Sequence, residues 1–224
     1  TAGSLKGSGG IANSSGTPGN IILTIGSDNS TPDAYSGVIS NGTATSVSLV
    51  KTGTGALTLT GTNTYTGTTT ISGGILLFGS TGCINSSSGV VADGGTLRTG
   101  ATTGYSQSTG TLDLTASSEI YLGTGSHSLS FSASAAKSWT AGAVLKIKGW
   151  EGSAGSPGTA GKVFVGADGS GLTVDQLSQI TFNGYNQGAG IMSSGEIYPL
   201  SAPAVSVTSP DPATDADIRQ ETVN

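Results

Sequence analysis

The fold is decided by residues 49–78, LVKTGTGALTLTGTNTYTGTTTISGGILLF. Apolar and polar residues alternate within this stretch, so that Leu57 and Leu59 fall on one face of a strand and Thr58 and Thr60 on the other. Alternation with a period of two, rich in Thr, Leu and Ile and interrupted by Gly, is typical of half-buried β-strands. One unit of this size cannot bury its apolar face alone, so it needs similar neighbours stacked on it.

The composition of the 224 residues favours an all-β fold built from small side chains. Charged residues make up 9% of the chain, against about a quarter in ordinary globular proteins, and there are 38 glycines. Disordered chains combine low hydrophobicity with high net charge, whereas this chain is 34% hydrophobic and its apolar residues are patterned. We therefore expect an ordered protein.

The charge balance excludes several classes of partner. The net charge is −5 and only 8 residues are Lys or Arg, with no basic stripe, so we expect no nucleic-acid or anionic-membrane partner. No apolar run approaches the roughly 20 residues that span a bilayer. The lone Cys83 permits no internal disulfide. The chain opens in the middle of its pattern without a signal peptide, which we interpret as a fragment or a mature form.

A Gly-X-Leu tripeptide recurs along the chain. It starts at Gly55, Gly74, Gly95 and Gly110, which is a loose period near 20. One strand per period is what a solenoid requires, and each coil of a right-handed parallel β-helix adds about 4.8 Å of height. We expect Leu, Ile and Val inside, Thr and Ser outside, and Gly or Asn at the corners. A β-sandwich has the same alternation and is the alternative, but the recurrence favours the solenoid.

The same stretch also resembles a known family. Residues 49–78 are similar to the autotransporter-associated β-strand repeat, also called the passenger-associated transport repeat, of large exported bacterial proteins. The matching positions are Leu49, Lys51, Gly53, Gly55, Leu57, Leu59, Gly61, Asn63, Thr64, Tyr65, Gly67, Thr69, Ile71, Gly73 and Gly74. The resemblance implies a parallel β-helix in a secreted or cell-surface protein, and it implies no activity.

The chain divides into three predicted parts. Residues 1–112 are the β-helix coils, residues 113–199 are terminal coils or a cap, and residues 200–224 are a linker or tail containing Pro and Asp. The middle part is richer in aromatic residues and holds the only helical signal. That signal is a capping box of Thr173 with Gln176, followed by a short apolar stripe of Leu177 and Ile180 that predicts about two turns.

Candidate catalytic groups are sparse. The only histidine, His127, is expected to face solvent, which leaves no base for a nucleophilic triad. Three carboxylates, Asp93, Asp113 and Glu119, lie on predicted coils with Arg98 as their only basic neighbour, and they form the weak case for a polysaccharide-active enzyme. We predict that the chain is not an enzyme, and we assign no catalytic, cofactor-binding or metal residues.

Three binding hypotheses remain as alternatives. Asp168 lies in a turn that resembles a calcium loop but lacks neighbouring carboxylates. Trp139 and Trp150 would stack on sugars if exposed, but are expected in the core of the cap. A threonine face that binds ice would require the same threonines on successive coils; the residues in question are Thr58, Thr60, Thr62, Thr64, Thr66, Thr68 and Thr70.

The sequence thus predicts a structural, adhesin-like β-helical segment of a secreted or cell-surface bacterial protein. Its expected partners are the secretion and outer-membrane machinery during export, and a host, cell-surface or polysaccharide ligand afterwards. A carbohydrate-binding or polysaccharide-active module is the alternative, and an ice-binding face is a minor one.

Overall fold

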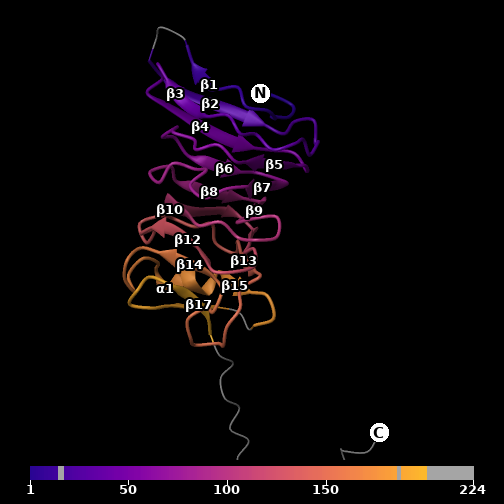
Figure 1. Cartoon of the computed structure of the whole chain (residues 1–224). Helices are drawn as coiled ribbons and strands as arrows, with labels where there is room; N and C mark the ends of the chain where they lie inside the picture. Colours follow the sequence, from indigo (N-terminus) through magenta and orange to yellow (C-terminus); the bar gives the residue numbers. More distant parts are fainter. Residues whose placement is uncertain (15–17, 186–187, 201–224) are drawn as a thin grey trace, which may run out of the picture.

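Parallel strands stacked coil on coil make up the molecule. The computed structural model describes residues 1–14, 18–185 and 188–200, so the predicted tail from residue 201 lies outside the described residues. The strands run in chain order from the N-terminal end to the end that carries the helix α1 (Figure 1). The predicted all-β parallel solenoid is confirmed, with about six turns.

Two parallel sheets form the long walls of the solenoid in the described part of the chain. The seven-stranded sheet contains β2 (Asn20–Ile25), β4 (Ser46–Lys51), β6 (Thr69–Ile71), β8 (Val90–Asp93), β10 (Gln107–Ala116), β12 (His127–Ser132) and β14 (Gly161–Val165). The six-stranded sheet contains β5 (Ala56–Leu59), β7 (Ile75–Phe78), β9 (Thr96–Arg98), β11 (Ser118–Tyr121), β13 (Leu145–Lys148) and β15 (Ile180–Phe182). From β4 onward each coil contributes one strand to each sheet, whereas the coil of β2 contributes to the seven-stranded sheet alone.

The core is a set of columns in which one side chain per coil stacks on the next. In the six-stranded sheet one column is Leu57, Leu76, Leu97, Ile120, Ile147 and Phe182, all buried. The first three members belong to the Gly-X-Leu tripeptides, which therefore mark a true repeat. The fourth tripeptide is an exception, because Leu112 lies in β10 and pairs with Val90 in the other sheet. The interval from Gly95 to Gly110 is shorter than the other intervals between tripeptides, and the column continues instead at Ile120.

Glycines stand where one coil crosses directly over the preceding one. A Cβ on Gly55 would lie 1.9 Å from the backbone oxygen of Ser30, and a Cβ on Gly61 would lie 2.1 Å from that of Gly37. Real side chains cannot approach so closely, so these corners close only with glycine. Stacking geometry therefore explains two fixed glycines of the motif.

Lys51 occupies an inward position of the seven-stranded sheet, between Ile25 on one coil and Ile71 on the next, and is only 1% exposed. Its ammonium donates to the carbonyl oxygens of Thr52 at 2.6 Å and of Gly73, on the following coil, at 3.3 Å. Burial lowers the pKa of Lys51, and the charge of Asp28 opposes that shift. Lys51 thus joins two coils by hydrogen bonds inside the core. The expectation that inward positions hold Leu, Ile and Val did not predict this.

Asn63 joins three coils in the same way. Its amide accepts from the backbone N–H of Ile39 at 2.7 Å and donates to the carbonyl of Cys83 at 2.7 Å. Nearby, the buried hydroxyl of Tyr65 bonds to that of Thr69 at 2.7 Å, and Thr69 in turn bonds to Ser88 on the next coil. Desolvation raises the pKa of Tyr65 and raises that of the buried Cys83 thiol to about 12, so both groups are neutral in the core.

The N-terminal end of the solenoid is open. Residues 2–13 form an incomplete coil, in which β1 (Ile11–Asn13) pairs with β3 (Ile39–Gly42). In the described part of the chain, residues 20–23 of β2 face no neighbouring strand on their outer edge, whereas the carbonyl of Thr24 accepts from the N–H of Ala2. The inward-pointing Ile21 is consequently 39% exposed, although Val47, its partner on the next coil, is buried.

The opposite end is closed by α1 (Val174–Ser178) and by an antiparallel hairpin of β16 (Ala189–Ile191) and β17 (Ile197–Pro199). The predicted capping box of Thr173 with Gln176 is present. The helix is shorter than the predicted two turns, because Ile180 belongs to β15 rather than to a helical stripe. Gln176 is buried and donates to the carbonyls of Ser134 and Lys137, so the helix is held over the last coils by the N3 residue of its capping box.

Gly55→Ala should lower the free energy of unfolding by about 1–3 kcal/mol or more, because the new methyl group meets the backbone of the preceding coil. Urea denaturation measures the effect. Gly9→Ala is the matched control, since nothing lies within 4 Å of its Cβ position, and it should leave stability unchanged or raise it by up to about 1 kcal/mol. Equal losses in the two variants would contradict stacking as the reason for Gly55.

Lys51→Met should lower the free energy of unfolding by about 1–3 kcal/mol, because carbonyls on two coils lose their donor. Since the folded-state pKa of Lys51 is lowered, the unfolded chain binds the proton more tightly. The stability of the wild type relative to Lys51→Met should therefore rise as the pH rises from neutral towards 10.5. Paired denaturation curves across that range measure the difference, and a falling difference would refute the assigned shift.

Candidate functional site

The three carboxylates expected on the coils do not form a common site, because each one contacts different partners. Asp93 accepts from the hydroxyls of Ser72 at 2.9 Å and Thr115 at 2.7 Å. Asp113 accepts from the backbone N–H of Leu114, the next residue of the same strand. Glu119 lies in the other sheet and forms an ion pair with Lys148 at 2.6 Å. The strand pairing places no two of them side by side.

His127 does not face solvent, so that expectation is wrong. The ring is an inward residue of β12 and is 6% exposed, with Nε2 at 2.8 Å from the hydroxyl of Thr99 and Nδ1 at 2.9 Å from the carbonyl of Gly125. Gly104 and Gly161 leave room for it, because a Cβ at either position would meet the ring. His127 and Leu129 are two positions apart in β12, so both side chains point inward.

The tryptophans lie in the core, as expected. Trp139 is 9% and Trp150 7% exposed. Trp150 packs edge-on against Phe182 and Tyr185, with ring centroids 5.4 and 5.3 Å away. They hold the closing coils together and offer no face to a sugar.

The structure also shows how the candidate calcium turn at Asp168 and the candidate threonine face are arranged. The carboxylate of Asp168 accepts from the backbone and hydroxyl of Ser170, and these bonds lower its pKa. In the part of the chain that the structure describes, no three metal-ligating side chains gather. The threonines run around one coil rather than along the axis: Thr58 pairs with Leu77, and Thr70 with Val50 and Val91. The sheets therefore carry no flat threonine array.

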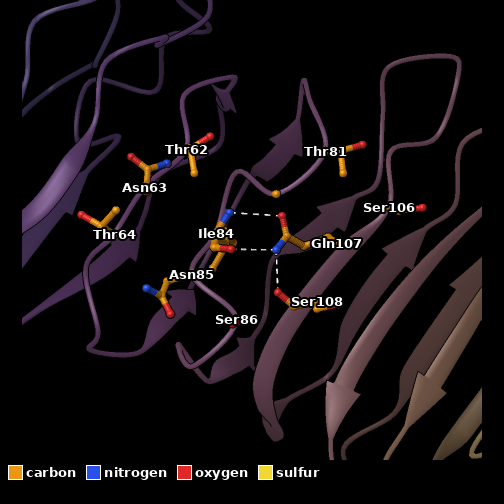
Figure 2. Close-up of a pocket in the computed structure, with 11 residues that line it drawn as sticks. Thr62, Asn63, Thr64, Thr81, Ile84, Asn85, Ser86, Ser106, Gln107 and Ser108 are labelled. Carbon is orange, nitrogen blue, oxygen red and sulfur yellow. Dashed lines mark hydrogen bonds between the residues drawn. The ribbon is translucent and has the colours of Figure 1, made fainter.

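A shallow polar groove of about 430 Å³ crosses the corner between the two sheets (Figure 2). Hydroxyl and amide groups line it, among them Thr62, Thr64, Asn85 and Ser108. Gln107 forms its floor, and its side-chain amide bonds to both the N–H and the carbonyl of Ile84. That amide is engaged in joining coils, and the groove presents a hydrogen-bonding surface.

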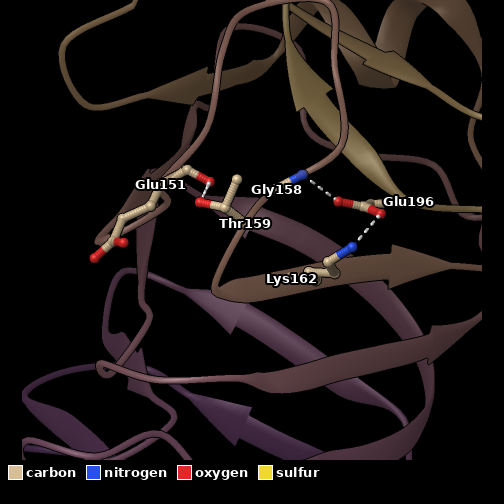
Figure 3. A network of polar contacts seen from close by, with 5 residues as sticks. All are labelled: Glu151, Gly158, Thr159, Lys162 and Glu196. Carbon is tan, nitrogen blue, oxygen red and sulfur yellow. Dashed lines mark hydrogen bonds and ion pairs between the residues drawn. The ribbon is translucent and has the colours of Figure 1, made fainter.

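The closed end contains a buried carboxylate, Glu196, which is 3% exposed (Figure 3). It accepts from the backbone N–H of Gly158 at 2.6 Å and pairs with the ammonium of Lys162 at 3.4 Å. Its backbone bridges Phe164 in an antiparallel sense, beside a bond from Val165 N–H to the Gly195 carbonyl. Glu196 therefore fastens the final hairpin to the last strand of the seven-stranded sheet, and no motif in the sequence pointed to it.

Comparison with protein families gives one match: residues 49–78 match the passenger-associated-transport-repeat. The predicted resemblance of this stretch is thereby confirmed. Neither the curated proteins nor the solved structures gave a match. No helix in the described residues is long and apolar enough to cross a membrane.

The repeat spans β5, β6, β7 and the end of β4, and its buried polar residues are the ones that join coils. Lys51, Asn63 and Tyr65 are each at most 1% exposed. The repeat therefore encodes the contacts between stacked coils, and it lies towards the open N-terminal end of the solenoid.

Glu196→Ala should lower the free energy of unfolding by about 1–3 kcal/mol, because the Gly158 N–H and the Lys162 ammonium lose their acceptor. Amide hydrogen exchange should become faster at Gly158 and Val165 and stay unchanged at Leu57, which lies far from the closed end in β5.

Glu119→Gln is the control for this change. Its ion pair with Lys148 is about one-third exposed, so its loss should cost less than about 1 kcal/mol and leave exchange at Val165 unaltered. If the two variants opened the closed end equally, Glu196 would have no special part in fastening it.

Proposed function

We propose that this chain is a segment of the passenger region of an exported bacterial surface protein, in which the β-solenoid serves as a stiff, adhesin-like rod. The observation that supports this most is the match to the passenger-associated-transport-repeat, whose buried residues supply contacts between adjacent coils. A rod of this kind holds binding elements away from the cell, and each coil lengthens it by about 4.8 Å.

The stiffness follows from how the coils are joined. Backbone pairing runs along both sheets, and the side chains of Lys51 and Asn63 add hydrogen bonds between coils inside the core. Each coil contacts only its neighbours, so the rod behaves as a stack in which bending requires parting adjacent coils.

The two different ends support a direction of assembly. The closed end has a buried aromatic cluster around Trp150 and the Glu196 fastening, while the open end presents an unpaired edge at β2. In a chain exported unfolded, the closed end is the natural template, onto which the remaining coils add one by one. Low charge and a single cysteine suit such export.

The proposed role is non-enzymatic. Asp93, Asp113 and Glu119 are engaged with separate partners, and the only histidine is buried against Thr99. The partners of the chain are then the bacterial secretion and outer-membrane machinery during export. Its location is outside the cell or on its surface, where a host, cell-surface or polysaccharide ligand is met.

The test is surface display. The full chain is placed between an export signal and an outer-membrane anchor in a bacterium, and intact cells are treated with protease. We expect a resistant fragment of the chain outside the cell, because a stacked β-solenoid exposes few cleavable segments.

The variants Gly55→Ala and Gly9→Ala distinguish a defect in folding from a defect in export. Gly55→Ala should reduce the resistant fragment several-fold while Gly9→Ala leaves it unchanged, because only the first disturbs coil stacking. A wild-type chain that stays in the periplasm, or reaches the surface fully protease-sensitive, would refute the proposal.

A further inference from the structure

The strand register gathers charged and aromatic side chains on the outer face of the six-stranded sheet. One outward row runs through Arg98, Tyr121 and Lys148 on three consecutive coils. The adjacent row places Glu119 beside Lys146. These five residues, called the basic face below, come from β9, β11 and β13 and are far apart in the sequence.

The basic face stands out against the charge of the whole chain. The chain has a net charge of −5 and only 8 basic residues, yet three of them meet here against one carboxylate. Elsewhere Lys51 is buried among carbonyls and Lys162 is paired with Glu196. Among the described residues, Lys146 has no carboxylate within ion-pair distance, so its charge is available to a ligand.

Tyr121 adds an exposed ring to this face. It is 40% exposed and is the one aromatic among the large apolar side chains exposed in the described residues. The Arg98 guanidinium lies 4.7 Å from the ring centroid and donates to the carbonyl of Ala101 at 3.1 Å. Both side chains are therefore held in place on a flat sheet before any ligand arrives, which reduces the entropy lost on binding.

We propose that the basic face binds an acidic polysaccharide, a chain of sugars bearing carboxylates, laid along the solenoid axis. Coils about 4.8 Å apart offer cations and an aromatic ring at regular steps, which suits a linear polymer better than a compact ligand. Carboxylates would pair with Arg98 and Lys146, and a sugar ring would pack on Tyr121. The charge complementarity is local, on a molecule that otherwise repels anions.

Two other polyanions fit less well. Tight nucleic-acid binding draws on about six to ten phosphate contacts, more than three cations supply. Anionic membranes attract clusters of about four to eight Lys or Arg, again more than are present. Both serve below as competing outcomes.

The experiment uses the purified full chain and measures binding to polygalacturonate by calorimetry at low salt. Dextran, a duplex DNA and vesicles containing anionic lipid are run beside it. We expect binding to polygalacturonate alone, weakened at least tenfold by raising the salt to physiological strength and above. No binding to polygalacturonate, or equal or tighter binding to DNA or vesicles, would overturn the proposal.

Variants locate the site. Lys146→Glu and Tyr121→Ser should each weaken binding at least fivefold, while Lys137→Glu, the same charge change in the exposed turn after β12, should leave it within twofold. Glu119→Gln should strengthen binding at least twofold, because it removes the only carboxylate of the face and frees Lys148. Circular dichroism checks that each variant is folded.

A loss of binding shared by Lys137→Glu, or no gain in Glu119→Gln, would place the interaction elsewhere and refute the assignment. The measurement uses the purified chain and does not require export. Failure here therefore leaves the proposed rod untouched, and failure of surface display leaves the binding face untouched.

Discussion

The structure depends on the close approach of each coil to the one before it. Within each of the two sheets, strands of successive coils lie at the ordinary strand spacing. The corners that connect the sheets must stack equally closely, and there the chain has no room for a side chain. Gly55 and Gly61 meet that requirement by having no Cβ. Because the corners close, the leucine column from Leu57 to Leu97 stays in register and the core remains continuous. A glycine-rich, weakly charged sequence is therefore a consequence of coil geometry.

Close stacking creates a second problem, which buried polar side chains solve. Corner residues leave the regular hydrogen-bond ladder, so some carbonyls and N–H groups in the interior need other partners. Lys51, Asn63 and Gln107 provide such partners for the carbonyls of Thr52, Cys83 and Ile84. An unpaired buried group costs more than a satisfied hydrogen bond contributes, so these residues fix which coil stacks on which. The motif at residues 49–78 can be recognised from the sequence because it combines corner glycines with buried polar side chains in one coil and a half.

The sequence predicted the solenoid, the repeat, the capping box at Thr173 and the burial of both tryptophans, since each depends on local pattern or on residue type. It did not predict the inward position of Lys51 or the burial of His127, because polar residues are expected on the outside of the coils. Those placements depend on which coil lies above and below. The coils also lengthen towards the closed end, so a fixed period cannot extrapolate the register beyond Leu97, and the tripeptide at Gly110 does not continue the leucine column.

The same lengthening explains why the basic face could not be predicted from spacing. Arg98, Tyr121 and Lys148 are separated by unequal lengths of chain, and only the strand pairing brings them into one row. In a solenoid the interior is constrained by stacking, whereas outward positions are free to vary from coil to coil. Most outward positions here are small and uncharged, as the composition requires. A concentration of cations around one exposed ring is therefore not demanded by the fold, and recognition of a ligand gives it a physical reason that stacking does not.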